Sequence, residues 1–303
     1  MRLLVIISIL LGNYALAQYN PIQSQYMFNP IVLNPAAAGT ENTFSIQASL
    51  RSQWTGFPGA PKTENLSFHA PVKNENAAFG MQLYAAQIGI DRNTGLFGIY
   101  AYRLRFENSD LRIGLSAGVN FRKSYYSRLD VIDNQDELLL NDSPLGILPD
   151  ASFGLHYSNN KFFVSFALPQ FLSHTYNGQN FQLGNDFRDY NFTLGSGYNF
   201  EFENGIALKP SFLAKYKIAS APQFDFNLMA RLSEGFSMGL SYRTNEALIL
   251  LLQVKFAERL SLMYSFGLPM NQLITYTYGS HEIGLKFNFK YNTKLSNPRY
   301  LGW

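Results

Sequence analysis

The strongest constraint on the fold is a period of two in side-chain polarity, which runs from about residue 43 to residue 292. Between Leu111 and Arg122, apolar side chains occupy every second position, and arginine, serine, asparagine and glycine fall between them. The same alternation recurs in residues 206–218, 224–231 and 282–291. Successive side chains of a strand point to opposite faces, so this pattern predicts strands with one apolar and one polar face.

Short groups of turn-forming residues separate these runs and predict hairpins. They fall at residues 91–93, 107–110, 158–160, 203–205, 233–235 and 243–245. The spacing predicts about fourteen strands, mostly of about 9 to 14 residues. The even strand number and the strand length both suit a tilted membrane barrel. Pro210 interrupts one run, and because a closed barrel has no free edge for its missing N–H, we expect a β-bulge there.

Alternation alone also fits a soluble β-sandwich, in which the apolar face points inward. Three features favour a transmembrane barrel instead. The runs are longer than the strands of about 5 to 6 residues that are usual in soluble proteins. The chain is rich in aromatic residues, with 19 Tyr and 26 Phe, and only 15% of its residues are charged. It also begins with a predicted export signal.

The first seventeen residues predict a signal peptide. Arg2 is followed by an apolar stretch, and Ala15-Leu16-Ala17 offers a small-x-small cleavage site before Gln18. The stretch is too short for a transmembrane anchor, which needs about 20 apolar residues. The chain has no cysteine, which excludes disulfide bonds, thiol chemistry and a lipidated cysteine. Its net charge of +3 is spread out, so no basic stripe predicts a nucleic-acid partner.

Two stretches break the alternation and predict long loops on one side of the barrel. Residues 125–149 are acidic, and a calcium site is one interpretation of this loop, although no calcium-loop spacing is present. Residues 169–189 are polar. Motifs for phosphate binding, nucleophilic serine or zinc catalysis are missing, and the four histidines are scattered singly. We therefore expect no enzyme, metal or cofactor, although a spatial pairing of Ser67 or Ser280 with a histidine stays open.

The segment before the first strands carries the most specific motifs. These are Gln25-Tyr26-Met27-Phe28-Asn29-Pro30, Asn34-Pro35-Ala36-Ala37-Ala38-Gly39 and Gln53-Trp54-Thr55-Gly56-Phe57-Pro58-Gly59-Ala60-Pro61. Each Asn-Pro pair favours a turn and disfavours helix before the proline. Residues 57–61 are too rigid and too poor in N–H donors for a strand, so we expect a shaped loop there. Such a segment could plug the lumen, cap one end of the barrel, or present aromatic side chains to a partner.

These motifs resemble the N-terminal signature of the PorP/SprF family. Residues 66–71 resemble its second strand, and residues 279–285 resemble its closing strand. The resemblance implies an all-β, antiparallel outer-membrane barrel of the type IX secretion and gliding machinery of Bacteroidetes. It divides the chain into a signal peptide (1–17), an N-terminal motif segment (18–42), a barrel (43–292) and a C-terminal tail (293–303).

The function implied by the resemblance is that of a non-catalytic component that contacts lipid, periplasmic ring proteins and peptidoglycan-associated proteins, or assists secretion and attachment of a surface adhesin. A porin-like or hydrophobic-ligand channel is the alternative, because the polar face could line a lumen. Our hypothesis for partner binding comprises ten residues: Tyr26, Met27, Phe28, Asn29, Pro30, Trp54, Phe57, Pro58, Gly59 and Pro61.

Overall fold

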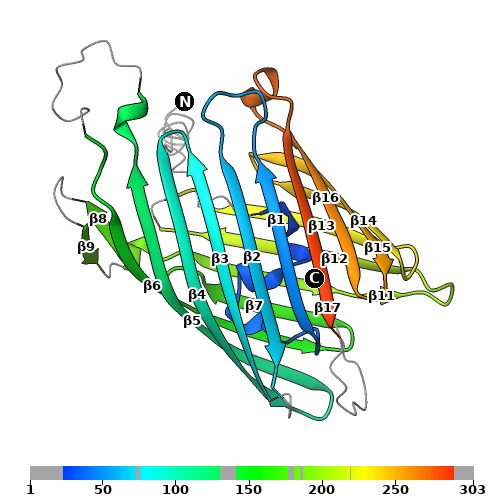
Figure 1. Cartoon of the computed structure of the whole chain (residues 1–303). Helices are drawn as coiled ribbons and strands as arrows, with labels where there is room; N and C mark the ends of the chain where they lie inside the picture. The colour runs from blue at the N-terminus through cyan, green and yellow to red at the C-terminus, as the bar shows by residue number, and fades with distance from the viewer. Residues whose placement is uncertain are drawn as a thin grey trace, which may run out of the picture.

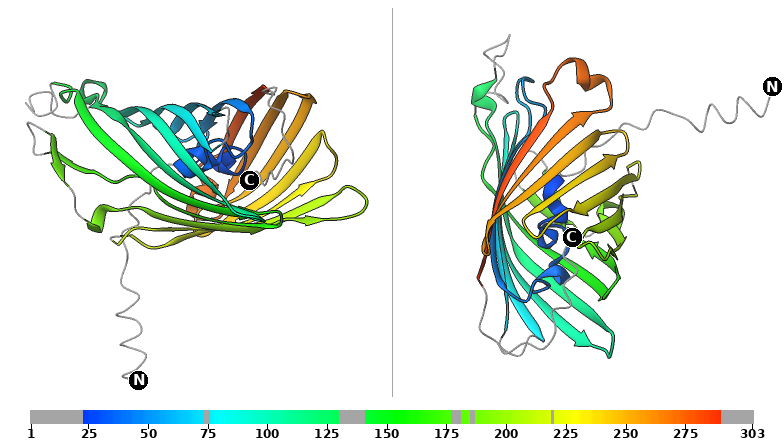
Figure 2. Two further views of the ribbon diagram at one scale, coloured as in Figure 1. Left: turned by 90° about the horizontal axis from the view of Figure 1, so that it is seen from below. Right: turned by 90° about the vertical axis from the view of Figure 1, so that its right-hand side faces the viewer.

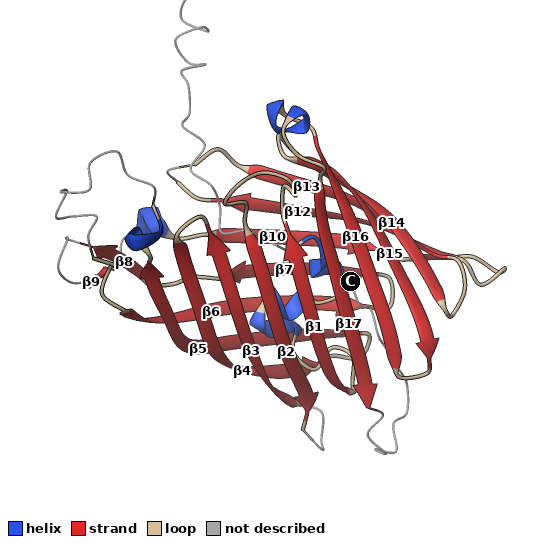
Figure 3. Ribbon diagram, turned by 45° about the horizontal axis from the view of Figure 1, so that its top comes forward, coloured by secondary structure: helices blue, strands red, loops and turns tan. Residues whose placement is uncertain are grey.

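The computed structural model describes residues 23–72, 76–129, 141–176, 181–184, 187–218 and 220–289. The predicted signal peptide and the predicted C-terminal tail lie outside these residues. Almost all of the described chain is antiparallel sheet (Figures 1 and 3). The strands are β1 (Phe44–Ser52), β2 (Lys62–Pro71), β3 (Ala77–Ile88), β4 (Asp91–Arg105), β5 (Ser109–Ser124), β6 (Gly146–Asn159), β7 (Phe162–Leu168), β10 (Phe192–Tyr198), β11 (Phe200–Glu201), β12 (Ala207–Tyr216), β13 (Gln223–Arg231), β14 (Phe236–Arg243), β15 (Ala247–Ala257), β16 (Leu260–Pro269) and β17 (Ser280–Phe289).

Neighbouring strands pair in sequence order and the sheet closes on itself. β1 pairs with β17, and β10 pairs with both β7 and β12, so no edge strand is left in the ring. The two-residue β11 continues β10 and pairs with the same partner, β12. The result is a closed barrel of fourteen strands, which confirms the predicted fold and strand number. A separate hairpin, β8 (Ser173–Tyr176) and β9 (Phe181–Gly184), lies in the connection between β7 and β10.

The exposure of side chains on the two faces of the barrel wall distinguishes a membrane barrel from a soluble sandwich. On β1, the inward Ser49 is 3% exposed and its outward neighbour Leu50 is 56% exposed. On β5, Ile113 and Leu115 are likewise exposed, whereas Arg112 and Ser116 are buried. The apolar face therefore points outward, as required for a wall surrounded by lipid, and the polar face points into the lumen. None of the described helices is long and apolar enough to cross a bilayer.

Pro210 is accommodated differently from our expectation, which was wrong. The register between β12 and β13 runs through Pro210 without a shift, so there is no bulge. Instead, the pairing with the opposite neighbour is interrupted. Gly197 pairs with Ser211 and Phe200 pairs with Leu208, but the residues between them, which lie opposite Pro210 and Lys209, form no ladder. The missing N–H of proline accounts for this gap between β10 and β11.

The connections differ at the two ends of the barrel. One end, the long-loop end, carries residues 53–61, 125–145, 169–191 and 270–279, together with three shorter turns. The other, the short-turn end, carries only turns such as residues 106–108 and 232–235 and the connection at residues 72–76. The predicted turn at residues 91–93 is in fact the start of β4, and the chain reverses two residues earlier at Gly89 and Ile90. Gly89 has a φ of 57°, which favours glycine there.

Candidate functional site

The N-terminal segment lies inside the lumen. Residues 23–43, which we call the plug, run inside the ring of strands from the long-loop end toward the start of β1 (blue in Figure 2). The plug contains three short 3₁₀ helices, η1 (Ser24–Met27), η2 (Pro30–Val32) and η3 (Pro35–Ala37). Proline occupies the first position of η2 and η3, and the preceding Asn29 and Asn34 are non-helical. The two Asn-Pro pairs therefore set where the second and third helices begin.

Aromatic and sulfur-containing side chains hold η1 against one side of the wall. Tyr26 is fully buried, and Met27 and Phe28 belong to the same apolar cluster. The wall contributes inward-facing residues of β12, β13, β15 and β16 to this cluster: Leu213, Met229, Ala247, Ile249, Leu251 and Met263. At the polar end of its ring, the Tyr26 hydroxyl accepts a hydrogen bond of 2.9 Å from Nδ2 of Asn227.

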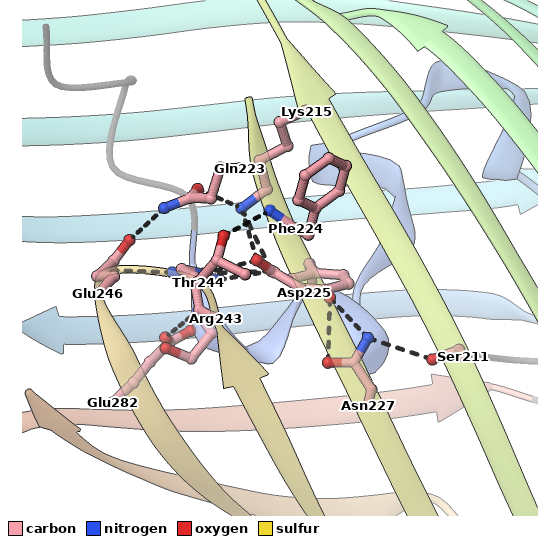
Figure 4. A network of polar contacts seen from close by, with 12 residues as sticks. Ser211, Lys215, Gln223, Phe224, Asp225, Asn227, Arg243, Thr244, Glu246 and Glu282 are labelled. Carbon is pink, nitrogen blue, oxygen red and sulfur yellow. Dashed lines mark hydrogen bonds and ion pairs between the residues drawn. The ribbon is translucent and has the colours of Figure 1, made fainter. Parts of the chain in front are cut away.

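Beside this cluster, a network of buried charges lies at the long-loop half of the wall (Figure 4). Asp225 on β13 accepts two hydrogen bonds from the Arg243 guanidinium, at 3.1 Å from Nε and 3.0 Å from Nη2. It also pairs with Lys215 Nζ at 3.2 Å. Arg243 continues to Glu246 at 3.1 Å, and Gln223 donates to the same carboxylate. Asp225 is fully buried, so this two-pronged pairing is what allows its charge inside the wall.

The network extends from the wall to the plug. Arg51 on β1 lies 3.7 Å from both Glu246 and Glu282 and donates a 2.8 Å hydrogen bond to Ser24 Oγ. Glu282 on β17 accepts a 2.7 Å hydrogen bond from the Ser24 backbone, and Gln25 Nε2 donates to the backbone carbonyl of Glu282 at 2.9 Å. The start of the plug is therefore fixed by charge-assisted hydrogen bonds to the strands that close the barrel.

Two further residues, Asn34 and Lys286, anchor the rest of the plug to the wall. Nδ2 of Asn34 reaches Ser165 Oγ at 2.7 Å, the Leu155 carbonyl at 2.9 Å and the Phe166 carbonyl at 3.2 Å. Lys286 on β17 pairs with Glu41 and donates to the Phe28 carbonyl at 3.2 Å. The plug is thus attached to β1, β6, β7, β13 and β17, strands from around the ring, and its position does not depend on one interaction.

Glycines on the inner face make room for the plug. A Cβ added to Gly114 on β5 would lie 2.1 Å from the Ala36 backbone nitrogen, and one on Gly154 would lie 1.8 Å from Oδ1 of Asn34. On the opposite wall, a Cβ on Gly284 would lie 2.3 Å from Oε1 of Gln25. At Gly114 the added Cβ would meet plug backbone, which cannot rotate away, so this position needs glycine. At Gly154 and Gly284 it would meet the ends of the Asn34 and Gln25 side chains, which would have to shift from their hydrogen-bonded positions.

The ten residues of the partner-binding hypothesis lie in two separate places. Tyr26, Met27, Phe28, Asn29 and Pro30 are buried in the lumen, as one of our alternatives anticipated, and they do not form an exposed surface. Partner binding through them would require the plug to leave the lumen, and it stays a prediction. The remaining five, Trp54, Phe57, Pro58, Gly59 and Pro61, belong to the connection between β1 and β2 at the long-loop end.

The connection between β1 and β2 is a shaped loop. Trp54, Gly56 and Gly59 have φ values of 49°, 91° and 70°. The Thr55 backbone exchanges two hydrogen bonds of 2.8 Å with residues 278 and 279, which ties this loop to the one between β16 and β17. Together the two loops expose an apolar surface that our interpretation of the sequence only half identified: Phe57, Pro58, Met270, Ile274, Tyr276 and Tyr278. Phe57 is 43% exposed and Tyr278 is 82% exposed. We call these six residues the loop patch.

Ser67, Ser280, His69 and His281, which had left an enzyme open, have hydrogen-bond partners other than a serine–histidine pair, and His156 stacks on Phe163. His69 Nδ1 accepts from the Gly39 backbone, Ser67 Oγ accepts from Asn29, and Ser280 Oγ accepts from the Trp54 backbone. His281 bonds to the Tyr264 hydroxyl, and the side chain of His174 lies outside the described residues. Within the described ranges, no three acidic, histidine or cysteine side chains gather as they would around a metal ion. Most of the acidic residues suggested for calcium fall in residues 130–140, which are not described.

Our reasoning from the sequence missed the wall residues that hold the plug. One signal was available: residues 247–252 are continuously apolar, so β15 breaks the alternation and presents apolar side chains to both lipid and lumen. Such a strand needs an apolar partner inside the barrel. The charged network had a weaker signal, since Asp225, Arg243 and Glu282 all fall on the polar face but nothing in the sequence shows that they meet.

Comparisons with known proteins agree with this architecture. Among solved structures, the fold is similar to the outer membrane protein Omp33 of Acinetobacter baumannii, with a TM-score of 0.50, 11% identity, and coverage of 83% of this chain and 100% of that one. It is also similar to the CymD monoaromatic hydrocarbon channel, with a TM-score of 0.51, 15% identity, and coverage of 89% and 94%. At these identities the likeness concerns the fold alone. No curated protein matches the sequence.

The family comparison is specific. The model of the family described as type IX secretion system membrane protein PorP/SprF matches residues 15–287, which includes the plug and all but the last two residues of β17. The chain therefore belongs to the PorP/SprF family of type IX secretion system membrane proteins.

Proposed function

We propose that this protein is a non-catalytic outer-membrane component of the type IX secretion system that works through its two ends and not through its lumen. At the short-turn end it would contact the periplasmic ring and peptidoglycan-associated proteins, and at the long-loop end it would assist secretion and surface attachment of a cognate adhesin. The observation that carries this proposal is the plug, which occupies the lumen and is tied to strands around the ring.

The orientation follows from the asymmetry of the connections. In bacterial outer-membrane barrels, short turns face the periplasm and longer loops face outward. By this rule the loop patch lies at the cell surface. An exposed group of aromatic and apolar side chains at such a place is typical of a protein contact, and Tyr is among the residues enriched in interfaces. We therefore assign adhesin docking to the loop patch, which retains Phe57 and Pro58 of the earlier hypothesis.

A porin-like channel is the alternative, and the similarity in fold to CymD is the observation that favours it. An open channel needs a continuous aqueous path, and the buried plug residues occupy part of the space that the polar inner face would otherwise line, which supports a closed barrel. Liposome swelling with small sugars and amino acids separates the two functions. We expect no swelling above that of empty liposomes, and solute-dependent swelling by the intact protein would favour the channel.

The experiment on the main proposal uses paired variants in cells. Replacing Phe57 and Tyr278 by Ala should strongly reduce surface display of the cognate adhesin, since a few exposed aromatic anchors carry most of the binding free energy at such interfaces. Leu145→Ala is the matched control, because Leu145 is an equally exposed apolar side chain on a different long loop. The heat-dependent gel shift reports on barrel assembly independently of docking.

Three outcomes are informative. Lost display with an unchanged gel shift, together with recovery of periplasmic ring proteins when the barrel is purified from membranes, supports both halves of the proposal. Normal display in the double variant would overturn docking at the loop patch. Failure to recover any ring protein with the wild-type barrel under conditions that keep the ring intact would overturn the contact at the short-turn end.

A further inference from the structure

A cavity of about 370 Å³, with both polar and apolar lining residues, lies on the long-loop side of the plug. Its floor is formed by plug residues Ile31, Val32, Leu33 and Pro35. Its walls come from the ends of β2 to β6, β10 and β12 that are next to the long loops. The volume is within the range of about 300–1,000 Å³ that is usual for small-ligand sites. Because plug residues line one side and the strand ends next to the long loops line the others, we expect a ligand to enter from the long-loop end, and a cavity of this size suits a compact molecule or the end of a chain.

The cavity presents hydrogen-bonding groups that the protein itself does not use. Asn65 on β2 is buried, and its side-chain oxygen has no hydrogen-bond partner; the same holds for the side-chain oxygen of Asn93 on β4. A buried acceptor without a partner costs about 1–3 kcal/mol, so a ligand that donates hydrogen bonds here is favoured. Gln82, Asn120 and Asn191 add further amide groups to the lining.

Neighbouring contacts hold these amides in place. The Tyr84 hydroxyl donates to Oδ1 of Asn120 at 2.5 Å and accepts from Nδ2 of Asn93 at 3.2 Å. The Tyr84 ring stacks on Phe97, with an interplanar angle of 10° and 6.3 Å between the ring centroids. Tyr84 and Phe97 both line the cavity, whereas the Phe192 ring packs against Phe166 and Tyr216 on the other face of the wall. The lining therefore combines fixed amide groups with aromatic rings, which suits a ligand that has both C–H faces and hydroxyl edges.

The buried charged groups in the lining already have partners. Lys215 pairs with Asp225 and donates to Gln223, and Oδ1 of Asp150 accepts from the backbone of Ala151 and two further residues. Arg122 lines the cavity as an exposed side chain near the end of β5. A peptide that entered this blind cavity by its end would bring an ammonium or a carboxylate group, for which no unpaired buried countercharge is present among the described lining residues. The end of a neutral glycan carries only hydroxyl and amide groups.

We propose that this cavity binds the non-reducing end of a neutral glycan, through hydrogen bonds from its hydroxyl groups to Asn65 and Asn93 and through packing of its ring on the aromatic wall. Two sources offer the same chemistry, a surface polysaccharide and a glycan attached to a secreted protein. The site is separate from the loop patch and does not depend on the proposed docking there.

The test is a glycan array probed with the fluorescently labelled, detergent-purified full-length protein. The array carries neutral oligosaccharides, acidic oligosaccharides, glycopeptides and the matching unglycosylated peptides. We expect saturable binding to a subset of neutral glycans. Asn65→Leu should weaken it about tenfold and Tyr84→Phe by about three- to tenfold, because each removes or frees neutral hydrogen bonds worth about 0.5–1.5 kcal/mol apiece.

Controls keep the result interpretable. Asn108→Leu makes the same change in an exposed turn at the opposite end and should leave binding unchanged. Every variant must show the wild-type heat-dependent gel shift, and Tyr84→Phe, which keeps the ring, serves if Asn65→Leu does not assemble. Binding to free oligosaccharides and glycopeptides alike indicates recognition of the glycan itself, whereas binding to glycopeptides alone assigns the secreted-protein source. No binding to any neutral glycan, equal binding by all variants, or binding to unglycosylated peptides would overturn the proposal.

Discussion

Replacing Gly114 by Ala should loosen the plug without damaging the wall. The added Cβ would lie 2.1 Å from the Ala36 nitrogen and 2.3 Å from the Pro35 carbonyl carbon, and both are backbone atoms that cannot rotate away. To relieve the clash, η3 must move off β5. The movement strains the three hydrogen bonds from Asn34 to the wall, which lie between 2.7 and 3.2 Å.

The size of the effect follows from those contacts. Nδ2 of Asn34 carries two hydrogens, so the three contacts amount to two full hydrogen bonds of about 0.5–1.5 kcal/mol each, and their loss weakens plug docking by about 1–3 kcal/mol. This corresponds to an increase in the released population of about 5-fold to 150-fold. A fourteen-stranded barrel without its plug is wider than the eight-stranded barrels that side chains alone can fill. Release should therefore appear as brief openings in single-channel recordings, in contrast to a silent wild type.

Gly98→Ala is the matched control, because Gly98 lies on the outer face of the neighbouring strand and a Cβ there would meet only one atom, at 3.9 Å. It should remain as silent as the wild type. Both variants should keep the heat-dependent gel shift of a closed barrel, since neither touches the ladder. If Gly114→Ala is as silent as Gly98→Ala and unfolds at the same urea concentration, the close docking of η3 on β5 is wrong.

Three other changes test the wall. Asp225→Ala should destabilise the barrel by about 3–5 kcal/mol in urea unfolding, because the buried Arg243 and Lys215 lose the carboxylate that they share and Arg243 keeps only Glu246; a change below about 1 kcal/mol would contradict the network. Leu115→Lys should cost about 2–4 kcal/mol if the residue lies near the bilayer midplane, and unaltered assembly into liposomes would contradict its outward placement. Burial alone would raise the pKa of Glu246, but the neighbouring arginines, Arg243 first, hold it below the usual value. Ionised Glu246 should therefore stabilise the barrel fully above the ordinary carboxyl pKa of about 4.3, and this stabilisation should be lost as the pH falls through the lowered pKa. The urea midpoint should decline less with falling pH in Glu246→Gln than in the wild type.

The barrel was predictable from the sequence because lipid and lumen impose a strict period of two on every strand. The exposed Leu50 and buried Ser49 show why the rule is reliable, since a shift of one residue would place the polar face in lipid. Turn positions were predictable to within about two residues. The largest difference, at residues 91–93, arose because the polar residues there already belong to β4, while the reversal itself uses Gly89.

The site was less predictable, because it depends on contacts between residues far apart in the chain. The motif containing Tyr26 was recognisable, but its partner Asn227 is separated from it by 201 positions. The sequence also could not show that Trp54 and Tyr26 lie in different places, because both are aromatic residues in proline-rich segments. What separates them is the course of β1, which carries the chain from the plug to the long-loop end.

The central claim is that the plug stays in the lumen while the protein does its work. The chain has no cysteine, so Ala36→Cys introduces a single thiol at a position that is fully buried between the plug and β5. Pro58→Cys, on the exposed loop between β1 and β2, is the positive control. Both are treated with a bulky, membrane-impermeant maleimide in living cells whose secretion is active. We predict rapid labelling of Pro58→Cys and no labelling of Ala36→Cys until the barrel is unfolded by heat; labelling of Ala36→Cys at the rate of Pro58→Cys would contradict the closed barrel.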